Sequence, residues 1–542
     1  MKKILLLTAL LFSLFANAQI INFPDANFKA YLVSDDVSAM NLTQTSYIPI
    51  DSNNDGEIQQ SEALAIGFLG VSNSAITNLS GIEFFANMTG LACGNIQISS
   101  LDISNNPLLT SLVCYQLPLL TSIDVSNNTA LTSLSFYETG LTSLDVSSNT
   151  ALINISCNNC ELTNLTFSSN NNTLKSLQCY NNMIANIDLT SLSSLESLSI
   201  GGNQLTNLNL NGLSSLETLG CGSNQLQSLN LNGLSNLTDL SCGYNQITSI
   251  NFQDQTNLKR FHCDNNQLTS INLNGLTNLL LLWCSNNQLA NLDFNGLVNL
   301  TNLDCSNNNL TNLNLAGLSS MEHLVCNNNQ ITSINLDGVN NLKTLYCNNN
   351  FISNIDLNGK CFLYSLYCSN NLLTSLNLNT MNMSITRLDC SNNQLTSLSI
   401  KNNYYNHEWG PFDFSNNPTL QYICVDTIEY QDVLNKVNQY NYVNCVINSD
   451  CNILDFNCAL SNEDFSINKI LIYPNPVKDS ITIDTTISIT TINIYNALGQ
   501  LAKVIPNAKG TKTIDVSNLN NGNYFMKIET SDGVVNQKFV KE

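Results

Sequence analysis

The nineteen cysteines carry the most reactive side chains of the chain, and their spacing limits the chemistry open to them. Side chains that return at one point of a regular repeat stack in a column and point the same way, which is unfavourable for disulfide geometry. Paired ligand spacings typical of zinc sites are absent. We therefore expect the regularly spaced cysteines to be free, buried thiols that pack as small apolar groups. They occur every 21 residues, at Cys221, Cys242, Cys263, Cys284, Cys305, Cys326, Cys347 and Cys368.

Other cysteines fall outside this spacing. Cys160 stands where other copies of the repeat have asparagine, and the role of Cys361 stays open. Four more lie at the end of the repeats, where an exported protein can use cysteines for disulfides. They are Cys424, Cys445, Cys451 and Cys458, and the sequence leaves their pairing open.

Histidine chemistry finds no support in the sequence. The chain has three histidines, and His262 is the direct neighbour of Cys263 in an expected strand. Adjacent strand residues point to opposite faces, so these two side chains cannot form a nucleophile and base pair. Zinc-protease helices, Gly-x-Ser-x-Gly turns and phosphate-binding loops are also absent from the sequence. The sequence predicts a protein that is not an enzyme.

The acidic segment 51–62 places oxygen-bearing side chains at the spacing of a calcium-binding loop. Gly56 permits the sharp turn in its middle. The segment resembles EF-hand and dockerin loops, although residues 41–50 are β-branched and polar rather than helical. The resemblance implies a structural calcium ion that stiffens a cap; the alternative is an acidic turn. The ligands would be Asp51, Asn53, Asp55, Glu57 through its carbonyl, Gln59 through a water molecule, and Glu62 with both carboxylate oxygens.

One repeated segment must position most of these residues. Each copy carries a Leu-x-Cys segment, an asparagine three residues after the cysteine, and a second alternating apolar segment. Alternation predicts two short strands per copy, and stacked copies bury a continuous core. The asparagine side chain can satisfy backbone groups in the turn after each strand. The pattern resembles the bacterial leucine-rich-repeat class with 21-residue units, and predicts a mainly β solenoid with a parallel sheet on its concave face.

The outward positions of the expected concave strands are the better functional candidates. Solenoids present this face as an extended binding surface, and exposed aromatic and arginine side chains are typical of interface centres. The candidate residues are Arg260, His262, Trp283, Asp304, His323, Tyr346, Tyr367, Arg387 and Asp389.

The repeats begin at Ile66, and their register breaks after Ile400. We expect Leu420–Val425 to resume the concave strand, after an insertion of about 14 residues relative to the repeat period. The insertion includes Tyr404, Tyr405, His407, Trp409 and Phe412, which form a second candidate surface. The expected organisation is a signal peptide (1–19), an N-terminal cap (20–65), the solenoid (66–425), a C-terminal cap (426–451), a linker (452–467) and a small β-sandwich domain (468–542).

The last 75 residues carry a second resemblance. Four segments resemble the type A C-terminal sorting domain of the type IX secretion system. They are 470–477, 492–499, 519–524 and 538–542. This resemblance implies interaction with the type IX secretion machinery, passage across the outer membrane, removal of the domain, and release or attachment at the cell surface.

The start of the chain and its charge restrict location and partners further. Lys2 and Lys3, an apolar stretch to Phe15 and the small residues around Ala18 predict a secretory signal peptide. No later apolar run is long enough for a transmembrane helix. The formal net charge of -21 argues against nucleic acid and anionic membranes as partners.

These features predict a secreted or cell-surface leucine-rich-repeat protein, adhesin-like, that binds a protein partner through its concave face. One alternative is carbohydrate binding through Trp283, Tyr346 and Tyr367, because sugar rings stack on aromatic side chains. The other is a structural spacer with a calcium-stiffened cap. The ligand, the oligomeric state and the mode of surface attachment stay open.

Overall fold

A computed structural model describes residues 19–34, 37–379, 385–401, 412–451, 471–485, 488–496, 501–506, 508–530 and 533–542. The chain divides into two compact units, Met1–Cys458 and Ala459–Glu542. The expected signal peptide up to residue 18, the linker 452–467, Cys458 and the residues Tyr404, Tyr405, His407 and Trp409 lie outside the described residues.

The N-terminal cap covers the first coil of the solenoid. It contains helix α2 (Ala26–Leu32), strand β1 (Ser38–Asn41) and helix α3 (Gln60–Ala63), and β1 pairs antiparallel with the first solenoid strand. Pro24 lies directly before the N-cap residue Asp25 and therefore outside the first turn of the helix. Phe28 and Leu32 of α2 are fully buried, so the cap closes the exposed end of the core.

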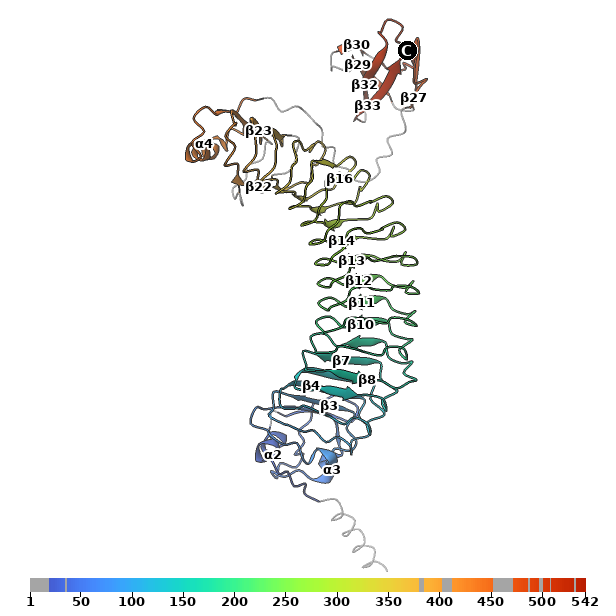
Figure 1. Cartoon of the computed structure of the whole chain (residues 1–542), viewed down its shortest axis with the longest axis vertical. Helices are drawn as coiled ribbons and strands as arrows, with labels where there is room; N and C mark the ends of the chain where they lie inside the picture. Colours follow the sequence, from blue (N-terminus) through green and yellow to red (C-terminus); the bar gives the residue numbers. More distant parts are fainter. Residues whose placement is uncertain are drawn as a thin grey trace, which may run out of the picture. The chain divides into compact units, whose positions relative to one another are not determined.

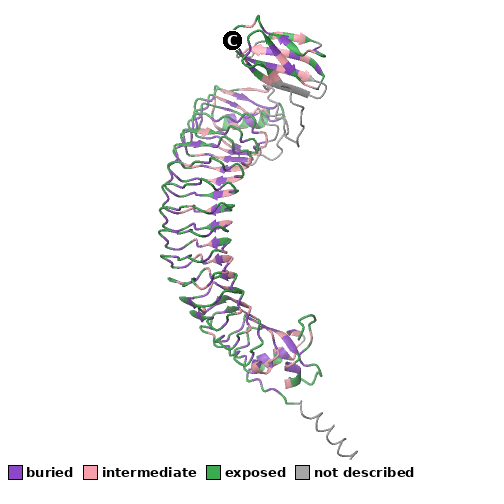
Figure 2. Cartoon of the chain, turned by 90° about the vertical axis from the view of Figure 1, so that its right-hand side faces the viewer, coloured by how far each residue is buried: buried purple, intermediate pink, exposed green. Residues whose placement is uncertain are grey.

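A single 18-stranded sheet runs through the solenoid. All of its strands except β1 are parallel to one another, and they lie on the inner side of the curved unit (Figures 1 and 2). This confirms the predicted mainly β solenoid with a concave parallel sheet. The parallel strands are β2 (Ile66–Ser72), β3 (Gly90–Gly94), β4 (Ser111–Leu117), β5 (Ser133–Thr139), β7 (Asn154–Asn158), β9 (Ser176–Gln178), β10 (Ser197–Ser199), β11 (Thr218–Gly220), β12 (Asp239–Ser241), β13 (Arg260–His262), β14 (Leu281–Trp283), β15 (Asn302–Asp304), β17 (His323–Val325), β19 (Thr344–Tyr346), β20 (Ser365–Tyr367), β22 (Arg387–Asp389) and β24 (Phe412–Asp413).

The second segment of each copy runs along the opposite side of the coil. Within the described residues it forms three small parallel sheets. They are β6 (Ser143–Asp145) with β8 (Asn164–Thr166); β16 (Asn312–Asn314) with β18 (Ser333–Asn335); and β21 (Ser375–Asn377), β23 (Ser397–Ser399), β25 (Tyr422–Cys424) and β26 (Val446–Asn448). A short 3-10 turn, Ile82–Phe84, precedes β3.

The cysteines form the predicted inward column. Every cysteine in it, from Cys93 to Cys390, is a free thiol and fully buried. Phe136 occupies the same column between Cys114 and Cys157, as the strand registers show. Burial raises the pKa of Cys93 and Cys347 to about 12, so these thiols stay protonated and unreactive at neutral pH.

A ladder of buried asparagines joins successive coils. The amide nitrogen of Asn287 donates to the carbonyl oxygens of Cys284 (3.2 Å) and of Cys263 in the preceding coil (3.0 Å). Its side-chain oxygen accepts from the backbone N–H of Leu268 at 2.9 Å. Each ladder residue therefore satisfies the turn of its own coil and that of its neighbour. The ladder comprises Asn182, Asn203, Asn224, Asn245, Asn266, Asn287, Asn308, Asn329, Asn350, Asn371, Asn393 and Asn417.

The early coils use asparagine at a different corner. Asn128 donates to the carbonyl oxygens of Ile103 (2.9 Å) and Asn106 (3.0 Å), and Asn149 repeats this arrangement one coil later. These side chains are fully buried on the side opposite the large sheet. In these coils, the position that carries a ladder asparagine in later coils is occupied by Ile96, Leu117, Thr139 and Cys160. The hydroxyl of Thr139 lies 3.1 Å from the sulfur of Cys160, so this cysteine does replace a ladder asparagine.

The end of the solenoid differs from the expectation. The segment Leu420–Val425 does not resume the concave strand; its residues Tyr422–Cys424 form β25, which pairs with β23 on the opposite side of the coil. The concave strand is β24, and Phe412 pairs with Leu388 there. Phe414 is fully buried and takes the place of the cysteine, and Asn417 ends the ladder three residues later. The prediction placed this strand at Leu420–Val425 and therefore missed Phe414, although phenylalanine fills the same inward position at Phe136.

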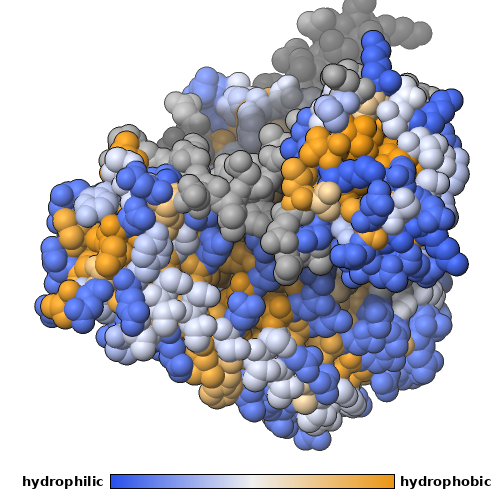
Figure 3. All heavy atoms as spheres, turned by 90° about the horizontal axis from the view of Figure 1, so that it is seen from above, coloured by the Kyte–Doolittle hydropathy of each residue, from blue (hydrophilic) through white to orange (hydrophobic). Residues whose placement is uncertain are grey.

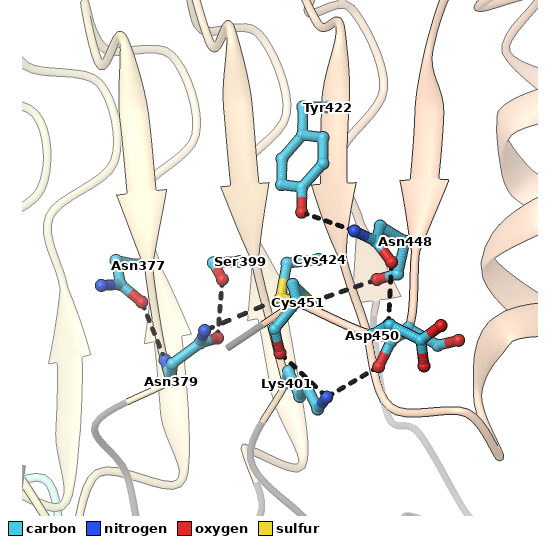
Figure 4. Close-up of a disulfide and its surroundings, with 10 residues drawn as sticks. Asn377, Asn379, Ser399, Lys401, Tyr422, Cys424, Asn448, Asp450 and Cys451 are labelled. Atoms are coloured by element: carbon cyan, nitrogen blue, oxygen red, sulfur yellow. Dashed lines mark hydrogen bonds between the residues drawn. A yellow bond between two sulfur atoms is a disulfide. The ribbon is translucent and has the colours of Figure 1, made fainter. Parts of the chain in front are cut away.

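The C-terminal cap consists of helix α4 (Tyr430–Gln439) and β26. A disulfide joins Cys424 of β25 to Cys451, with 6.0 Å between their Cα atoms (Figure 4). The ammonium group of Lys401 donates to the carbonyl oxygens of Ser449 (2.7 Å) and Cys451 (3.0 Å), so it also holds this end of the cap. Cys361 is disulfide-bonded as well. The expectation of a disulfide at Cys445 is wrong, because Cys445 is a free, half-buried thiol.

The second unit contains two antiparallel sheets. One comprises β27 (Leu471–Tyr473), β28 (Ser480–Asp484) and β31 (Thr513–Asp515). The other comprises β30 (Leu501–Pro506), β29 (Ile489–Asn496), β32 (Gly522–Thr530) and β33 (Gly533–Lys541). Residues of both sheets, including Ile481, Ile492 and Met526, share one apolar core. Two sheets around one core are consistent with the predicted small β domain.

Replacing Asn287 by alanine tests the ladder. We expect the free energy of unfolding to fall by about 1–3 kcal/mol, because the substitution leaves the buried N–H of Leu268 and the carbonyl of Cys263 short of a partner. Asn278→Ala is the matched control, since Asn278 is exposed and makes one hydrogen bond, to the carbonyl of Thr256. Urea titrations followed by circular dichroism provide the measurement. Equal losses in the two variants would contradict a structural role for the ladder.

Asp25 joins the N-terminal cap to the first coil. Its carboxylate accepts from the N–H groups of Asn27 and Phe28 in α2 and of Thr77 and Asn78 in the solenoid. Burial raises its pKa, but the hydrogen bonds from Thr77, Phe28 and Asn27 outweigh burial and place the pKa below the ordinary 3.8. The stabilisation is therefore present above pH 3.8 and lost as the pH falls through the lower folded-state pKa.

Asp25→Ala should weaken this joint by about 0.5–2 kcal/mol at neutral pH, as the loss of an N-cap does. Hydrogen exchange of the amides of α2, measured near neutral pH and again in acid, gives the readout. We expect faster exchange in the variant at neutral pH and convergence with the native protein in acid. A difference between the two proteins that grows as the pH falls would refute this assignment.

Candidate functional site

The predicted candidates lie on the outward positions of strands β13 to β22, which bring them together in two columns. The registers align His262 with Trp283, and Tyr346 with Tyr367. Inward residues such as Phe261 and Leu282 are fully buried and hold the backbone in place. The concave face therefore presents its side chains at fixed intervals, about 4.8 Å from one strand to the next.

An aromatic stack lies on β13 and β14, the first two strands of this surface. The rings of His262 and Trp283 are stacked, with centroids 4.3 Å apart and planes inclined by 21°. Trp283 remains 43% exposed. Among the described residues the Nε2 atom of His262 is buried without a hydrogen-bond partner. Burial lowers the pKa of His262 against the opposing effect of Asp264 and Asp239, so the imidazole is neutral at neutral pH.

A second aromatic pair lies further along the sheet. The rings of Tyr346 and Tyr367 meet edge to face, with centroids 4.8 Å apart, and both side chains are half-buried. The Nδ1 atom of His323 lies 3.0 Å from the hydroxyl oxygen of Thr344 on the neighbouring strand. Contacts between coils therefore orient these side chains before any partner binds.

The charged candidates divide into two kinds. Arg260 forms an ion pair with Asp239 of the adjacent strand, and Arg387 is exposed. Asp304 accepts from the N–H (3.0 Å) and hydroxyl (2.6 Å) of Ser306, and Asp389 does the same with Ser391. Both aspartates thus cap the bend after their strand. Their carboxylate oxygens are therefore already engaged in hydrogen bonds within the turn. The sequence pattern Asp-Cys-Ser could have indicated this role.

The sequence reasoning missed a tyrosine pair in the early coils. Tyr115 of β4 and Tyr137 of β5 are aligned in the sheet and are 36% and 41% exposed. They directly follow Cys114 and Phe136, whereas candidates such as His262 and Trp283 directly precede their column cysteine, two positions earlier in the repeat. The available signal was an aromatic residue at the same place in two consecutive copies.

The predicted calcium loop adopts a turn held by its own side chains. Asp51 accepts from the N–H groups of Asp55 (3.1 Å) and Gly56 (2.8 Å), and Gly56 has a φ of 79°. Glu62 accepts from the N–H groups of Ser52 (2.8 Å) and Gln59 (2.9 Å). Lys29 of α2 forms an ion pair of 2.6 Å with Glu57, which ties the loop to the cap helix.

This donor set has the chemistry of a hard-cation site. All of its potential ligands are oxygens, and a carboxylate oxygen that accepts one N–H retains a further lone pair. Across the described residues, however, no group of three or more His, Cys, Asp and Glu side chains is arranged to hold a metal ion. The expected ligands Asn53 and Gln59 are amides, and Asn53 donates to Gln59 at 3.0 Å.

Large apolar residues are also exposed outside this face, among them Tyr47, Ile428 and Val443. Figure 3 shows hydrophobic residues in small groups between hydrophilic ones on the face that it draws. Within the described residues, no helix is long and apolar enough to cross a membrane.

Comparison with known families supports the assignment of the repeats and of the C-terminal domain. Residues 471–542 match the secretion system C-terminal sorting domain, and residues 319–359 match leucine-rich repeats in two copies. The chain is therefore a leucine-rich-repeat protein that carries a C-terminal sorting domain, as both resemblances implied. Such a domain indicates export, with the protein secreted or held at the cell surface. Among curated proteins, none matches the chain by sequence.

Solved structures show the same fold. A leucine-rich-repeat protein of Leptospira interrogans is 22% identical, with a TM-score of 0.52, covering 72% of this chain and 97% of its own. The functional domain of InlJ from Listeria monocytogenes, which includes a cysteine ladder, is 21% identical, with a TM-score of 0.43, covering 97% of this chain and 99% of its own. The first similarity establishes the solenoid fold and nothing about a ligand.

Proposed function

We propose that this protein binds a protein partner outside the cell through the concave face of strands β13 to β22. The observation that carries the proposal is the stack of His262 and Trp283, in which Trp283 is 43% exposed. An aromatic ring that is already held in place loses little conformational freedom on binding, and exposed rings of this kind dominate interface centres. Leucine-rich-repeat scaffolds are typical of binding proteins rather than enzymes.

Other residues of the same concave face favour a protein over a glycan as the ligand. Tyr346 and Tyr367 meet edge to face and are half-buried, so they present ring edges rather than one flat stacking surface. Charges of both signs line the strands, with Arg260 paired to Asp239 and Lys343 paired to Glu322 at 2.7 Å. Aromatic groups surrounded by paired and unpaired charges resemble the core and rim of a protein interface. Carbohydrate binding and a purely structural spacer are the alternatives.

A double substitution tests the proposal. We expect Trp283→Ala with Tyr346→Ala to weaken binding to the partner about tenfold or more, because each ring contributes at least about 1 kcal/mol when it is an interface anchor. The partner is first identified by crosslinking to the native protein, and affinities are then measured by surface plasmon resonance. Phe351→Ala is the matched control, since Phe351 is an aromatic residue, 53% exposed, that lies outside the strands.

The outcomes distinguish protein binding, carbohydrate binding and a structural spacer. A glycan array that retains the native protein and loses the double variant would favour the carbohydrate alternative. If the native protein, the double variant and the control behave identically in these assays, neither ring takes part in binding, and only the structural-spacer hypothesis would remain. A protein partner that is lost from the double variant alone supports the proposal.

We further propose that the loop 51–62 binds one calcium ion, which stiffens the N-terminal cap. The ion would be held by Asp51, Asn53, Asp55, Glu62, the carbonyl of Glu57 and a water molecule on Gln59, and would offset the negative charge collected there. Calorimetry should show uptake of about one ion and a rise in the melting temperature with calcium. Asp55→Ala should remove both effects, whereas Asp124→Ala, an exposed carboxylate in a solenoid turn, should keep them. Absence of calcium uptake by the native protein would end the proposal.

A further inference from the structure

The two coils built on β4 and β5 differ from the rest of the concave face. Their strands have seven residues each, whereas the strands of the regular copies have three. The registers align Tyr115 with Tyr137, and both rings point outward from the sheet with substantial exposure. This pair lies at the opposite end of the sheet from Tyr346 and Tyr367, so a site here is independent of the proposed function.

The ring of Tyr115 rests on the neighbouring strand. A side-chain carbon added to Gly94 would lie 1.9 Å from Cζ and 2.1 Å from Cε1 of Tyr115. Glycine is therefore required at Gly94 to leave room for the ring. The backbone of β3 supports one side of the tyrosine and fixes its orientation, which is the arrangement of a preformed stacking platform.

Two residues beside the tyrosines adopt an unfavourable backbone conformation. Gln116 and Glu138 both have φ near 54°, in the left-handed region where the corresponding turns of most later coils place asparagine or glycine. A longer side chain is less favourable there than asparagine or glycine. The same turn has a positive φ in the other coils as well, so the conformation belongs to the repeat, and the unusual feature is the residue type at Gln116 and Glu138. Gln116 and Glu138 are exposed, so core packing does not explain their presence.

The two strained residues form one polar group with Tyr137. The amide nitrogen of Gln116 donates to the carboxylate of Glu138 at 3.2 Å. Glu138 also hydrogen-bonds the hydroxyl of Tyr137, which raises the pKa of that tyrosine. A carboxylate acceptor and an amide with both donor and acceptor capacity thus lie beside two exposed rings.

The charge of this region restricts the ligand. Strands β3, β4, β5, β7 and β9 contain no lysine, arginine or histidine. The outward residues between the leucine and the column residue are Ala92, Val113, Ser135, Ser156 and Gln178, all of them uncharged. The strands carry one carboxylate, and Lys175, directly before β9, is paired with Glu196 at 2.7 Å, so this face is unsuited to phosphates, acidic glycans and nucleic acids. It is suited to an uncharged ligand rich in hydroxyl groups.

We propose that Tyr115, Gln116, Tyr137 and Glu138 form a binding site for an uncharged oligosaccharide. The C–H face of a sugar ring would stack on the tyrosines, as apolar surfaces do on aromatic rings. Neighbouring sugar hydroxyls would donate to the carboxylate of Glu138 and pair with the amide of Gln116. Further sugar units would extend over the serine and glutamine side chains of the following strands.

Calorimetric titration of the full chain tests this site. The probes are hexasaccharides of glucose, mannose and xylose units, with oligogalacturonate as the charged comparison. We expect at least one neutral hexasaccharide to bind at concentrations up to about 1 mM and the charged one to bind more weakly. Tyr137→Ala should weaken binding about tenfold or more, and Phe351→Ala, at an exposed aromatic residue outside the strands, should leave it unchanged.

Two conservative variants keep the test valid if Tyr137→Ala unfolds. Glu138→Gln preserves shape and removes the charged acceptor, and should weaken binding severalfold. Gly94→Ala cannot touch the sugar but displaces Tyr115, and should also weaken it. The proposal is overturned if no neutral hexasaccharide binds, if oligogalacturonate binds more tightly, or if a folded Tyr137→Ala or Glu138→Gln variant binds as the native protein does. Binding that Trp283→Ala abolishes would place the sugar elsewhere and also overturn it.

Discussion

The hydrogen bonds of one buried asparagine in each regular coil hold the solenoid in register. The chain must bend after every concave strand, and the bend leaves backbone carbonyl and N–H groups inside the protein, away from the sheet and from water. The ladder amides satisfy those groups in two coils at once, as Asn287 does with Cys263, Leu268 and Cys284. Because each ladder residue spans a pair of coils, the cysteine column, the sheet register and the spacing of the outward side chains all depend on it.

The ladder changes place along the chain, and the concave surface changes with it. Up to Asn149 the buried amides serve the corner opposite the large sheet, and from Asn182 onward the ladder serves the corner that follows the concave strand, while the buried amide of Gln255 again donates at the opposite corner, to the carbonyl of Leu231. Where the concave corner is free of asparagine, β4 and β5 extend past the column residues and carry Tyr115 and Tyr137 outward. The solenoid therefore offers two chemically different stretches, a tyrosine-rich one that carries the carboxylate of Glu138 and one around Trp283 that carries charges of both signs.

Inward and outward residues contribute separately to stability and binding. The inward column needs apolar residues of suitable size, so cysteine, phenylalanine, isoleucine and valine replace one another there without loss of register. Burial keeps the thiols protonated, which suits an exported protein that carries many cysteines and few disulfides. The outward positions are free of this constraint, and the sorting domain directs that variable surface outside the cell.

The sequence by itself determined the solenoid, its concave sheet, the buried cysteine column, the asparagine ladder and the sorting domain, because a strict period forces equivalent residues into equivalent environments. Where the period loosens, sequence reasoning failed: Leu420–Val425 joined the opposite sheet, Cys445 stayed free, and Tyr115 with Tyr137 went unnoticed. Only the tertiary structure decided that His262 stacks on Trp283, that Asp304 and Asp389 cap turns, and that Gly94 supports Tyr115. These contacts join residues of different coils or depend on side-chain orientation, which the spacing of residues along the chain does not specify.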